Sequence, residues 1–128
     1  RRGGVKPFPR RVPAATLAQA REGFTTAPAP AVQKALDKAG WKASAVDLYE
    51  INEAFAVVTM ACVKDLGLDM AKVNVNGGAC ALGHPIGATG ARLVTTLVPA
   101  LIRRGLKRGV APQCIGGGEA TAIAIEVL

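Results

Sequence analysis

A glycine-rich segment, residues 76–90, constrains this chain more than any other feature, because it holds the only histidine among the 128 residues. The segment reads NGGACALGHPIGATG. Gly87 and Gly90 fall where a strong helical pattern begins, and each glycine there costs about 1 kcal/mol relative to alanine. Judged by residue type alone, His84 would be a surface or structural residue. The glycines around it favour a functional reason for the bare backbone.

Pro85 is predicted to be the first residue of a helix that runs to Arg104, since proline is favoured at that position. His84 would then stand just before the helix, at the positive end of its dipole, which favours a neutral imidazole. A neutral ring placed there can donate a hydrogen bond to a developing oxyanion while its other nitrogen takes or holds a proton. The segment therefore predicts a reactive histidine.

Strand and helix patterns alternate along the chain, which predicts an α/β fold: one layered domain over residues 1–128, with a mixed sheet covered by helices. The last two strands, joined by the glycines at 116–118, predict an antiparallel hairpin. Ligands on such sheets gather where strands end and helices begin, so Asn52, His84 and the glycines after Cys114 are expected at one edge. The predicted strands cover residues 11–20, 46–51, 73–75, 109–115 and 120–127, and the predicted helices cover residues 28–39, 55–66 and 85–104.

Two further polar residues are candidates for chemistry, each with a structural alternative. The bare amides of residues 116–118 would lower the pKa of the Cys114 thiol and make it a proton shuttle or a nucleophile. Alternatively, Cys114 is a small core residue on an apolar strand. Asn52 would either cap the following helix or position a water. Cys62 is predicted to lie in the core, while the direction of Cys80 is not readable from the sequence.

The composition limits the kinds of partner and compartment. Sixteen basic and nine acidic residues give a net charge of +7. A solvated basic face is favoured over an anionic small ligand, and nucleic acid is disfavoured because no aromatic residues are interleaved for base stacking. No apolar run approaches the ~18 residues of a membrane span, and the cysteines lack disulfide or metal-site spacing. We expect a cytoplasmic protein with free thiols, no metal and no membrane contact. The basic clusters are Arg1, Arg2, Lys6, Arg10 and Arg11, and Arg103, Arg104, Lys107 and Arg108.

Three motifs together resemble the C-terminal domain of thiolases, the acetyl-CoA acetyltransferases and 3-ketoacyl-CoA thiolases. They are NEAF at 52–55, the histidine segment at 76–90 and CIGGG at 114–118. They occur in the order and approximate spacing of that family, over nearly the whole chain. The resemblance implies the C-terminal half of a thiolase-like fold. It also implies a Claisen condensation of acyl-CoA with acetyl-CoA, or the reverse thiolysis of 3-ketoacyl-CoA, in fatty acid metabolism.

The resemblance implies a role for each polar residue of these motifs. His84 would bind the thioester oxygen and help activate the acyl-accepting cysteine, and Asn52 would hold the water that completes the first oxyanion hole. Cys114 would be the acid/base that removes a proton from the α-carbon of the second acyl-CoA, or returns it in the reverse direction. The backbone amide of Gly116 would contribute to the second oxyanion hole. Related decarboxylating condensing enzymes use two histidines, so the single histidine favours a thiolase.

The resemblance further implies acyl-CoA and coenzyme A as substrates, with no bound cofactor, and Ala54 and Phe55 lining the pantetheine channel. Thiolases carry a separate nucleophilic cysteine on an N-terminal domain, and no cysteine here stands in that motif. We therefore expect a fragment that is inactive alone, that partners the N-terminal domain and that belongs to a homo-oligomer. Pro112 departs from the family, which generally has a residue able to donate to the strand ladder there.

Two other functions stay open from the sequence. The first is a non-catalytic thiolase-like remnant that packs against a partner. The second is a basic module that binds nucleic acid, for which salt-sensitive binding would be the sign. The motifs favour the enzyme over both.

Overall fold

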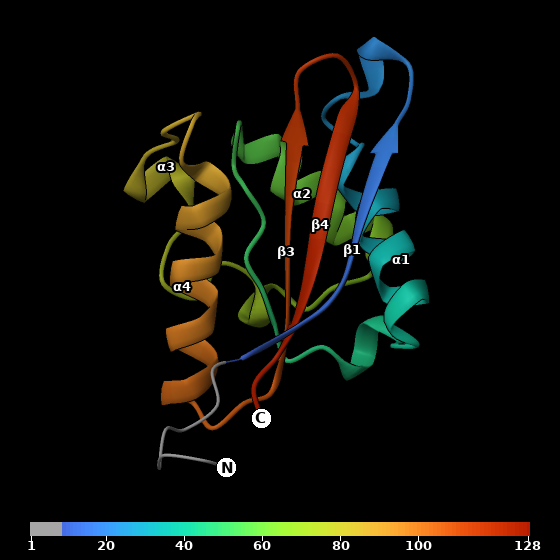
Figure 1. Ribbon diagram of the computed structural model, residues 1–128. Helices are drawn as coiled ribbons and strands as arrows, with labels where there is room; N and C mark the ends of the chain where they lie inside the picture. Colours follow the sequence, from blue (N-terminus) through green and yellow to red (C-terminus); the bar gives the residue numbers. More distant parts are fainter. Residues whose placement is uncertain (1–8) are drawn as a thin grey trace.

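One mixed sheet of four strands, in the order β1-β4-β3-β2, forms the centre of the computed structural model, which describes residues 9–128 (Figure 1). The strands are β1 (Arg10–Ala18), β2 (Leu48–Tyr49), β3 (Arg108–Ile115) and β4 (Glu119–Glu126). Strand β4 runs antiparallel to both β1 and β3, whereas β2 runs parallel to β3. The predicted α/β architecture, with its mixed sheet and final antiparallel hairpin, is therefore confirmed.

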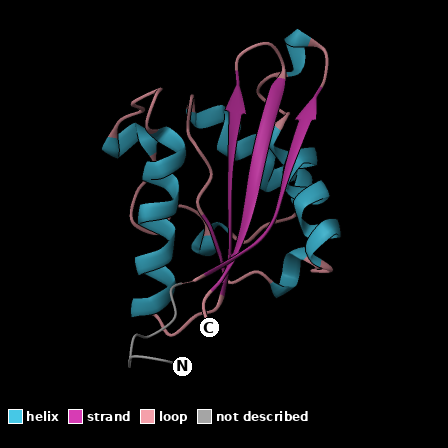
Figure 2. Cartoon of the chain, in the orientation of Figure 1, coloured by secondary structure: helices cyan, strands magenta, loops and turns pink. Residues whose placement is uncertain are grey.

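Helices cover both faces of this sheet, as Figure 2 shows. On one face α1 (Pro28–Ala39) contacts β1 and β4, and α2 (Ala56–Leu66) lies against α1. On the other face α4 (Thr89–Arg103) contacts β3. The predicted helix stops are confirmed, because Gly40 and Gly67 adopt left-handed φ angles of 67° and 61° and end α1 and α2. Glycine takes this conformation without the steric cost of a side chain.

The two faces of the sheet are built from alternating residues, because successive side chains of a strand point to opposite sides. Val110 and Ala124 belong to the core cluster shared with α1, whereas Ala111 and Ile125 belong to the cluster shared with α4. A side chain at Gly109 would come within 2.9 Å of leucine methyl groups of α4. Helix α4 therefore packs closely against β3 and is fixed relative to the strand that ends at the candidate site. The leucines of α4 in this core are Leu93, Leu97 and Leu101.

The strand predicted over residues 46–51 is confirmed only at Leu48–Tyr49. Beyond β2 the chain still follows β3, since the backbone N–H of Asn52 donates to the carbonyl of Pro112 at 3.1 Å. The N and C=O of one strand residue face the same neighbour, so the ring nitrogen of Pro112 faces this segment and has no hydrogen to donate. Pro112 thus shortens the ladder beside β2, yet β3 stays paired with β4 through Ile115.

The strand predicted over residues 73–75 is wrong. Val73 makes a single isolated bridge to Tyr49. The next residue, Asn74, has a positive φ of 48°, which turns the chain out of an extended conformation. What forms there is a turn that leads into the glycine-rich segment.

The helix predicted to begin at Pro85 begins instead at Thr89, and a short helix, α3 (Ala79–Leu82), precedes it. The turn between them is closed by the Thr89 hydroxyl, which donates to the carbonyl of Pro85 at 3.0 Å. Ile86, which the helix predicted over residues 85–104 would include, lies in this turn, and its side chain is 87% exposed. His84 lies in this loop and not at a helix terminus.

Some of the basic side chains make contacts within the fold. Arg10 and Arg108 both pair with Glu126, and the guanidinium of Arg108 lies 4.9 Å from the centre of the Trp41 ring. Cation–π contacts of this kind stabilise a charge on the surface. The predicted cluster members at residues 1, 2 and 6 lie outside the described residues. Over residues 9–128, every helix is too short or too polar to cross a membrane.

Candidate active site

A cavity of about 420 Å³ opens where β3 ends and the loop before α4 passes it. It brings together three regions that are far apart in the sequence: Ala54, His84, and the pair Cys114 and Gly116. Strands and loops that meet at one sheet edge are where ligands gather in α/β folds. The predicted convergence is present for His84 and the residues from Cys114 onward, whereas Asn52 does not line the cavity. The lining residues are Phe24, Ala54, His84, Ile86, Thr89, Gln113, Cys114, Ile115 and Gly116.

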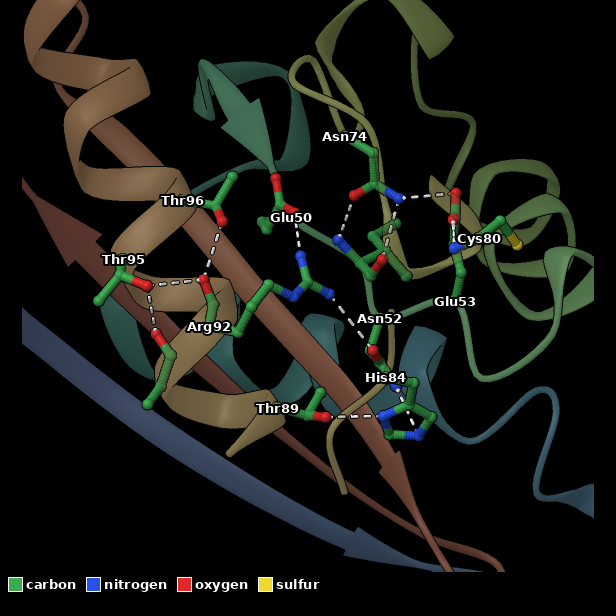
Figure 3. A network of polar contacts seen from close by, with 12 residues as sticks. Glu50, Asn52, Glu53, Asn74, Cys80, His84, Thr89, Arg92, Thr95 and Thr96 are labelled. Atoms are coloured by element: carbon green, nitrogen blue, oxygen red, sulfur yellow. Dashed lines mark hydrogen bonds and ion pairs between the residues drawn. The ribbon is translucent and has the colours of Figure 1, made fainter. Parts of the chain in front are cut away.

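His84 is exposed to the cavity and is held through both ring nitrogens (Figure 3). Its Nδ1 lies 2.6 Å from the Thr89 hydroxyl oxygen, and its Nε2 lies 3.4 Å from the Asn52 amide nitrogen. Because α4 begins only at Thr89, the predicted position of His84 at the helix start is wrong. The orientation of the imidazole ring is therefore set by its contacts with Thr89 and Asn52, and not by a position at the start of α4.

Asn52 is wholly buried directly behind His84. The residue that precedes α2 is Phe55, and no side chain caps that helix, so the capping alternative for Asn52 is wrong. Its Oδ1 accepts a hydrogen bond from Arg92 at 3.4 Å. A buried amide needs partners for both ends, and Asn52 finds them in Arg92 and His84.

Beneath Asn52 lies a buried ion pair that joins the sheet to α4. Nη1 of Arg92 is 2.7 Å from Oε1 of Glu50, whose side chain is 2% exposed. Burial raises the pKa of Glu50 to about 7, although the nearby charge of Arg92 opposes this shift. A buried charge without a partner is costly. The pair therefore anchors the Asn52 segment to α4.

Glu53 forms a second link, from the segment after β2 to the glycine-rich segment. Its carboxylate accepts the backbone N–H of Cys80 at 2.8 Å and the side-chain amide of Asn74 at 3.1 Å. A Cβ at Gly78 would clash with this carboxylate, so a larger residue there would displace Glu53 from its two hydrogen bonds. Partial burial pushes the pKa of Glu53 up, but the hydrogen bonds from Cys80 and Asn74 outweigh it and leave the pKa below its usual value.

Cys114 is the last residue but one of β3 and is half-buried in the cavity wall. Burial raises the pKa of its thiol above the ordinary value, although its own backbone N–H acts in the other direction. The prediction that the following glycines lower this pKa is therefore wrong, because the glycine sequence does not report burial. At neutral pH the group holds its proton and can deliver it.

The three glycines of the turn after Cys114 differ in how strictly their backbone requires glycine. Gly117 and Gly118 have left-handed φ angles of 87° and 84°. A Cβ at Gly118 would come within 2.5 Å of the carbonyl oxygen of Gln19. Gly116 has neither restriction, and its backbone lines the cavity. The turn is thus fixed by contact with the residues that follow β1.

The other predicted site and core residues fall in different places. Phe55 does not line the cavity; its side chain is 61% exposed and makes an edge-to-face contact with Phe24, with ring centres 6.3 Å apart. Cys62 is buried as predicted, and burial raises the pKa of its thiol to about 12. Cys80 is exposed. All three cysteines are free, as predicted.

Sequence reasoning missed Thr89, Arg92 and Gln113. A signal for Arg92 exists, because a lone arginine falls beside Leu93 on the apolar face of the predicted helix while Glu50 interrupts an apolar strand. Two opposite charges in apolar stretches indicate a buried ion pair. Gln113 lines the cavity, and its buried Oε1 has no hydrogen-bond partner among the described residues.

Within residues 9–128, His, Cys, Asp and Glu side chains do not gather in groups of three that would hold a metal.

Comparisons with known proteins agree with this geometry. The acetyl-CoA acetyltransferase of Shinella zoogloeoides is 51% identical over 127 residues, which make up 99% of this chain and 32% of that protein. The crystal structure of the Bacillus anthracis acetyl-CoA acetyltransferase superposes with a TM-score of 0.94 at 46% identity, covering 98% of this chain and 32% of that one. Human mitochondrial 3-ketoacyl-CoA thiolase gives a TM-score of 0.93 at 43% identity, covering 96% and 31%.

The chain thus spans about a third of the length of these relatives. The sequence model of the thiolase C-terminal domain matches residues 5–127. Sequence, fold and the convergence of the three motifs on one cavity agree, and the chain belongs to the thiolase family as a C-terminal domain.

Proposed function

We propose that this chain supplies one half of the active site of an acyl-CoA C-acetyltransferase, a thiolase. The observation that carries the proposal is that His84 and Cys114, from segments distant in sequence, face one cavity of about 420 Å³. Forming a carbon–carbon bond between two thioesters needs a base at the α-carbon and places that stabilise negative charge on both thioester oxygens. An imidazole, a thiol and the backbone amide of Gly116 around one space meet those needs.

In the proposed condensation, Cys114 as thiolate takes a proton from the α-carbon of acyl-CoA. The resulting carbanion attacks the carbonyl carbon of an acetyl group held on a separate cysteine. His84, with the water held by Asn52, stabilises the oxygen of the acetyl group, and the amide of Gly116 stabilises the oxygen of the enolate. The bond to the separate cysteine then breaks, and its sulfur leaves as thiolate. An acid/base group contributes about 10²–10⁴ in rate and one oxyanion donor about 3–4 kcal/mol.

In thiolysis the same groups act in reverse, and Cys114 delivers its proton to the carbanion that leaves as acyl-CoA. The raised pKa of the Cys114 thiol supports this role, because the group is protonated at neutral pH. Ala54 lines the same cavity and suits contact with the pantetheine arm, with Phe55 extending that contact toward solvent. The substrates proposed are acyl-CoA and coenzyme A, with no other cofactor.

The acyl-accepting cysteine is proposed to come from an N-terminal domain outside this chain. Neither Cys62 nor Cys80 lines the cavity, and Cys62 is buried in the core. The relatives are about three times as long, which leaves room for such a domain. We also propose a homo-oligomer in the cytoplasm, a reducing compartment that suits free thiols. Light scattering on the protein joined to its N-terminal domain tests the oligomer, and a monomer contradicts it.

The test is to join this chain to the N-terminal two-thirds of the Shinella zoogloeoides relative and to follow acetoacetyl-CoA cleavage by coenzyme A. His84→Ala and Cys114→Ala are each expected to lower kcat by about 10²–10⁴. Cys80→Ser is the matched control, because its side chain is exposed and lies outside the cavity lining. If neither substitution lowers the rate, the catalytic roles are wrong.

The same protein separates the other functions. A correctly folded chimera that binds its partner domain but shows no cleavage would favour the non-catalytic remnant. For the nucleic-acid module, the sign would be oligonucleotide binding that weakens steeply with salt. We expect no such binding at physiological ionic strength.

A further inference from the structure

A continuous chain of polar contacts runs from the buried ion pair to the cavity (Figure 3). Its links join Glu50 to Arg92, Arg92 to Asn52, Asn52 to His84 and His84 to Thr89. The proposed mechanism uses only Asn52 and His84 from this chain. The outer members are buried or half-buried, and the direction in which each of them donates decides where the hydrogens of His84 lie.

The direction is fixed at the arginine end. A guanidinium only donates hydrogen bonds, so Arg92 Nη2 at 3.4 Å requires the carbonyl oxygen of the Asn52 amide on its side. The amide nitrogen of Asn52 then faces Nε2 of His84, at 3.4 Å. That nitrogen donates and cannot accept. Nε2 is therefore the acceptor and carries no hydrogen when the ring is neutral.

The contact between Thr89 and Nδ1 of His84 independently indicates the same tautomer. The single hydroxyl hydrogen of Thr89 is directed at the carbonyl of Pro85, at 3.0 Å. Its oxygen, 2.6 Å from Nδ1 of His84, is therefore the acceptor for a ring N–H. Nδ1 carries the hydrogen. Two separate constraints, one at each ring nitrogen, select the same tautomer.

We propose that Arg92 is a positioning residue that locks the Asn52 amide in one orientation and so, together with Thr89, holds neutral His84 as the Nδ1–H tautomer. Glu50 keeps Arg92 in place through the contact of 2.7 Å. The tautomer stands on the geometry alone, whereas its catalytic consequence rests on the proposed thiolase function. Arg92 touches neither substrate nor reacting atoms in this arrangement.

The consequence concerns the moment when Nε2 takes up the proton of the acyl-accepting thiol. With the amide locked, Asn52 presents an N–H and no acceptor to the new Nε2–H, so the thioester oxygen is the acceptor left for that hydrogen. With the amide flipped, the carbonyl oxygen of Asn52 would face Nε2 and accept that hydrogen. The flipped amide would draw the donor away from the reacting oxygen. Arg92 excludes the flipped state, because the amide N–H groups of Asn52 would then face the N–H groups of the guanidinium, and neither side could accept.

The chain offers a direct test, since His84 is its only histidine. Labelling histidine with ¹⁵N gives ring signals from this residue alone, and the shifts of the two nitrogens distinguish the tautomers. With the ring in its neutral form, the wild-type chain is expected to show a hydrogen on Nδ1 and none on Nε2. An Nε2–H tautomer in the folded wild-type chain would overturn the proposal.

The matching variant is Arg92→Met combined with Glu50→Gln, which removes both buried charges so that neither is left unpaired. Thr89 still favours Nδ1–H in this variant, so the signals of His84 are expected to shift only partly toward the second tautomer. Arg103→Met on the same helix is the control, because Arg103 is exposed at the end of α4. An unchanged tautomer in the folded double variant would show that Arg92 does not act on the ring, and would contradict the positioning role.

A kinetic readout in the chimera separates positioning from simple support of the fold. The double variant is expected to lose about 10²-fold in kcat, as for a misplaced catalytic group, with KM changed less than threefold. A loss confined to KM would contradict the positioning role. The NMR measurement needs no turnover, so an inactive chimera with the predicted tautomer would reject the thiolase function while leaving the tautomer lock intact.

Discussion

The two walls of the cavity are held in place by different means. The imidazole wall, with His84 and Asn52, depends on side-chain contacts that lead back to a buried ion pair (Figure 3). The thiol wall, with Cys114 and Gly116, is part of the hairpin of β3 and β4 and depends on backbone pairing through Ile115. The first wall is sensitive to charge and protonation, whereas the second is sensitive to backbone geometry.

This difference suits the two tasks proposed for the walls. A ring that accepts and returns a proton must keep a defined orientation of donors and acceptors, which only specific side chains provide. A thiol that acts at carbon, beside a backbone amide that stabilises an oxyanion, needs a rigid frame more than a network. Substitutions that change one wall at a time therefore test this contrast.

The largest expected effect comes from breaking the ion pair behind the imidazole wall. Arg92→Met leaves Glu50 buried without its partner and is expected to lower the free energy of unfolding by about 3–5 kcal/mol. Adding Glu50→Gln should restore most of that loss. Urea unfolding well above the Glu50 pKa of about 7, which the loss of Arg92 raises further, measures both, with Arg103→Met as the control. A loss below about 1 kcal/mol in the single variant, the scale of an exposed pair, would contradict the contrast.

The next effect is expected on the thiol wall, from Gly118→Ala. The substitution forces a side chain onto a φ of 84° and against the carbonyl oxygen of Gln19. We expect a loss of about 2–4 kcal/mol, because left-handed strain and a backbone clash add. Gly116→Ala is the matched control, with open space and an ordinary φ, and should stay within about 0.5 kcal/mol. Equal losses in the two variants would show that the turn does not impose this geometry.

A smaller effect is expected at Glu53, which ties the imidazole wall to the glycine-rich segment. Glu53→Gln weakens two hydrogen bonds to a partly exposed carboxylate and should cost about 1 kcal/mol. Because the folded state lowers the pKa of Glu53, its stabilising effect is present above the usual value of 4.5 and is lost as the pH falls through the folded pKa. Urea unfolding of both proteins from neutral to acidic pH should therefore show the difference shrinking. A constant difference would contradict the assignment, and Glu22→Gln is the exposed control.

The smallest perturbation is alkylation of the three thiols, which needs no substitution. Exposed Cys80 should react first with iodoacetamide, half-buried Cys114 more slowly, and buried Cys62 only on unfolding. The pKa of every one of these thiols is raised, by burial at Cys114 and Cys62 and by the hydrogen bond to Glu53 at Cys80, so the exposure of the sulfur sets the expected order. Mass spectrometry of timed samples gives the order. Reaction of Cys114 ahead of Cys80 would indicate an activated thiol instead of a protonated one.

Much of the fold could be predicted from local patterns. The apolar period of residues 28–39 and the glycine at position 40 predict α1 with its observed ends. The two strand-length runs joined by the glycines at 116–118 likewise predict the hairpin. Both signals are local, and no distant contact changes them.

The imidazole wall was less predictable because its contacts join residues far apart in the sequence. Proline at position 85 indicates a helix start, yet the bonds of Thr89 to His84 and to the Pro85 carbonyl move that start to Thr89. Arg92 finds Glu50 across 42 positions of the chain. A periodic pattern marks the face on which a side chain lies but not the charge that it meets.

The most direct measurement is a crystal structure of the chimera with a non-cleavable analogue of acetoacetyl-CoA. If both walls serve one reaction, the acyl group lies inside the cavity, between the imidazole of His84 and the thiol of Cys114, with its α-carbon facing Sγ of Cys114. An acyl group bound outside the cavity, or one reached by only one of the two side chains, would contradict a shared active site.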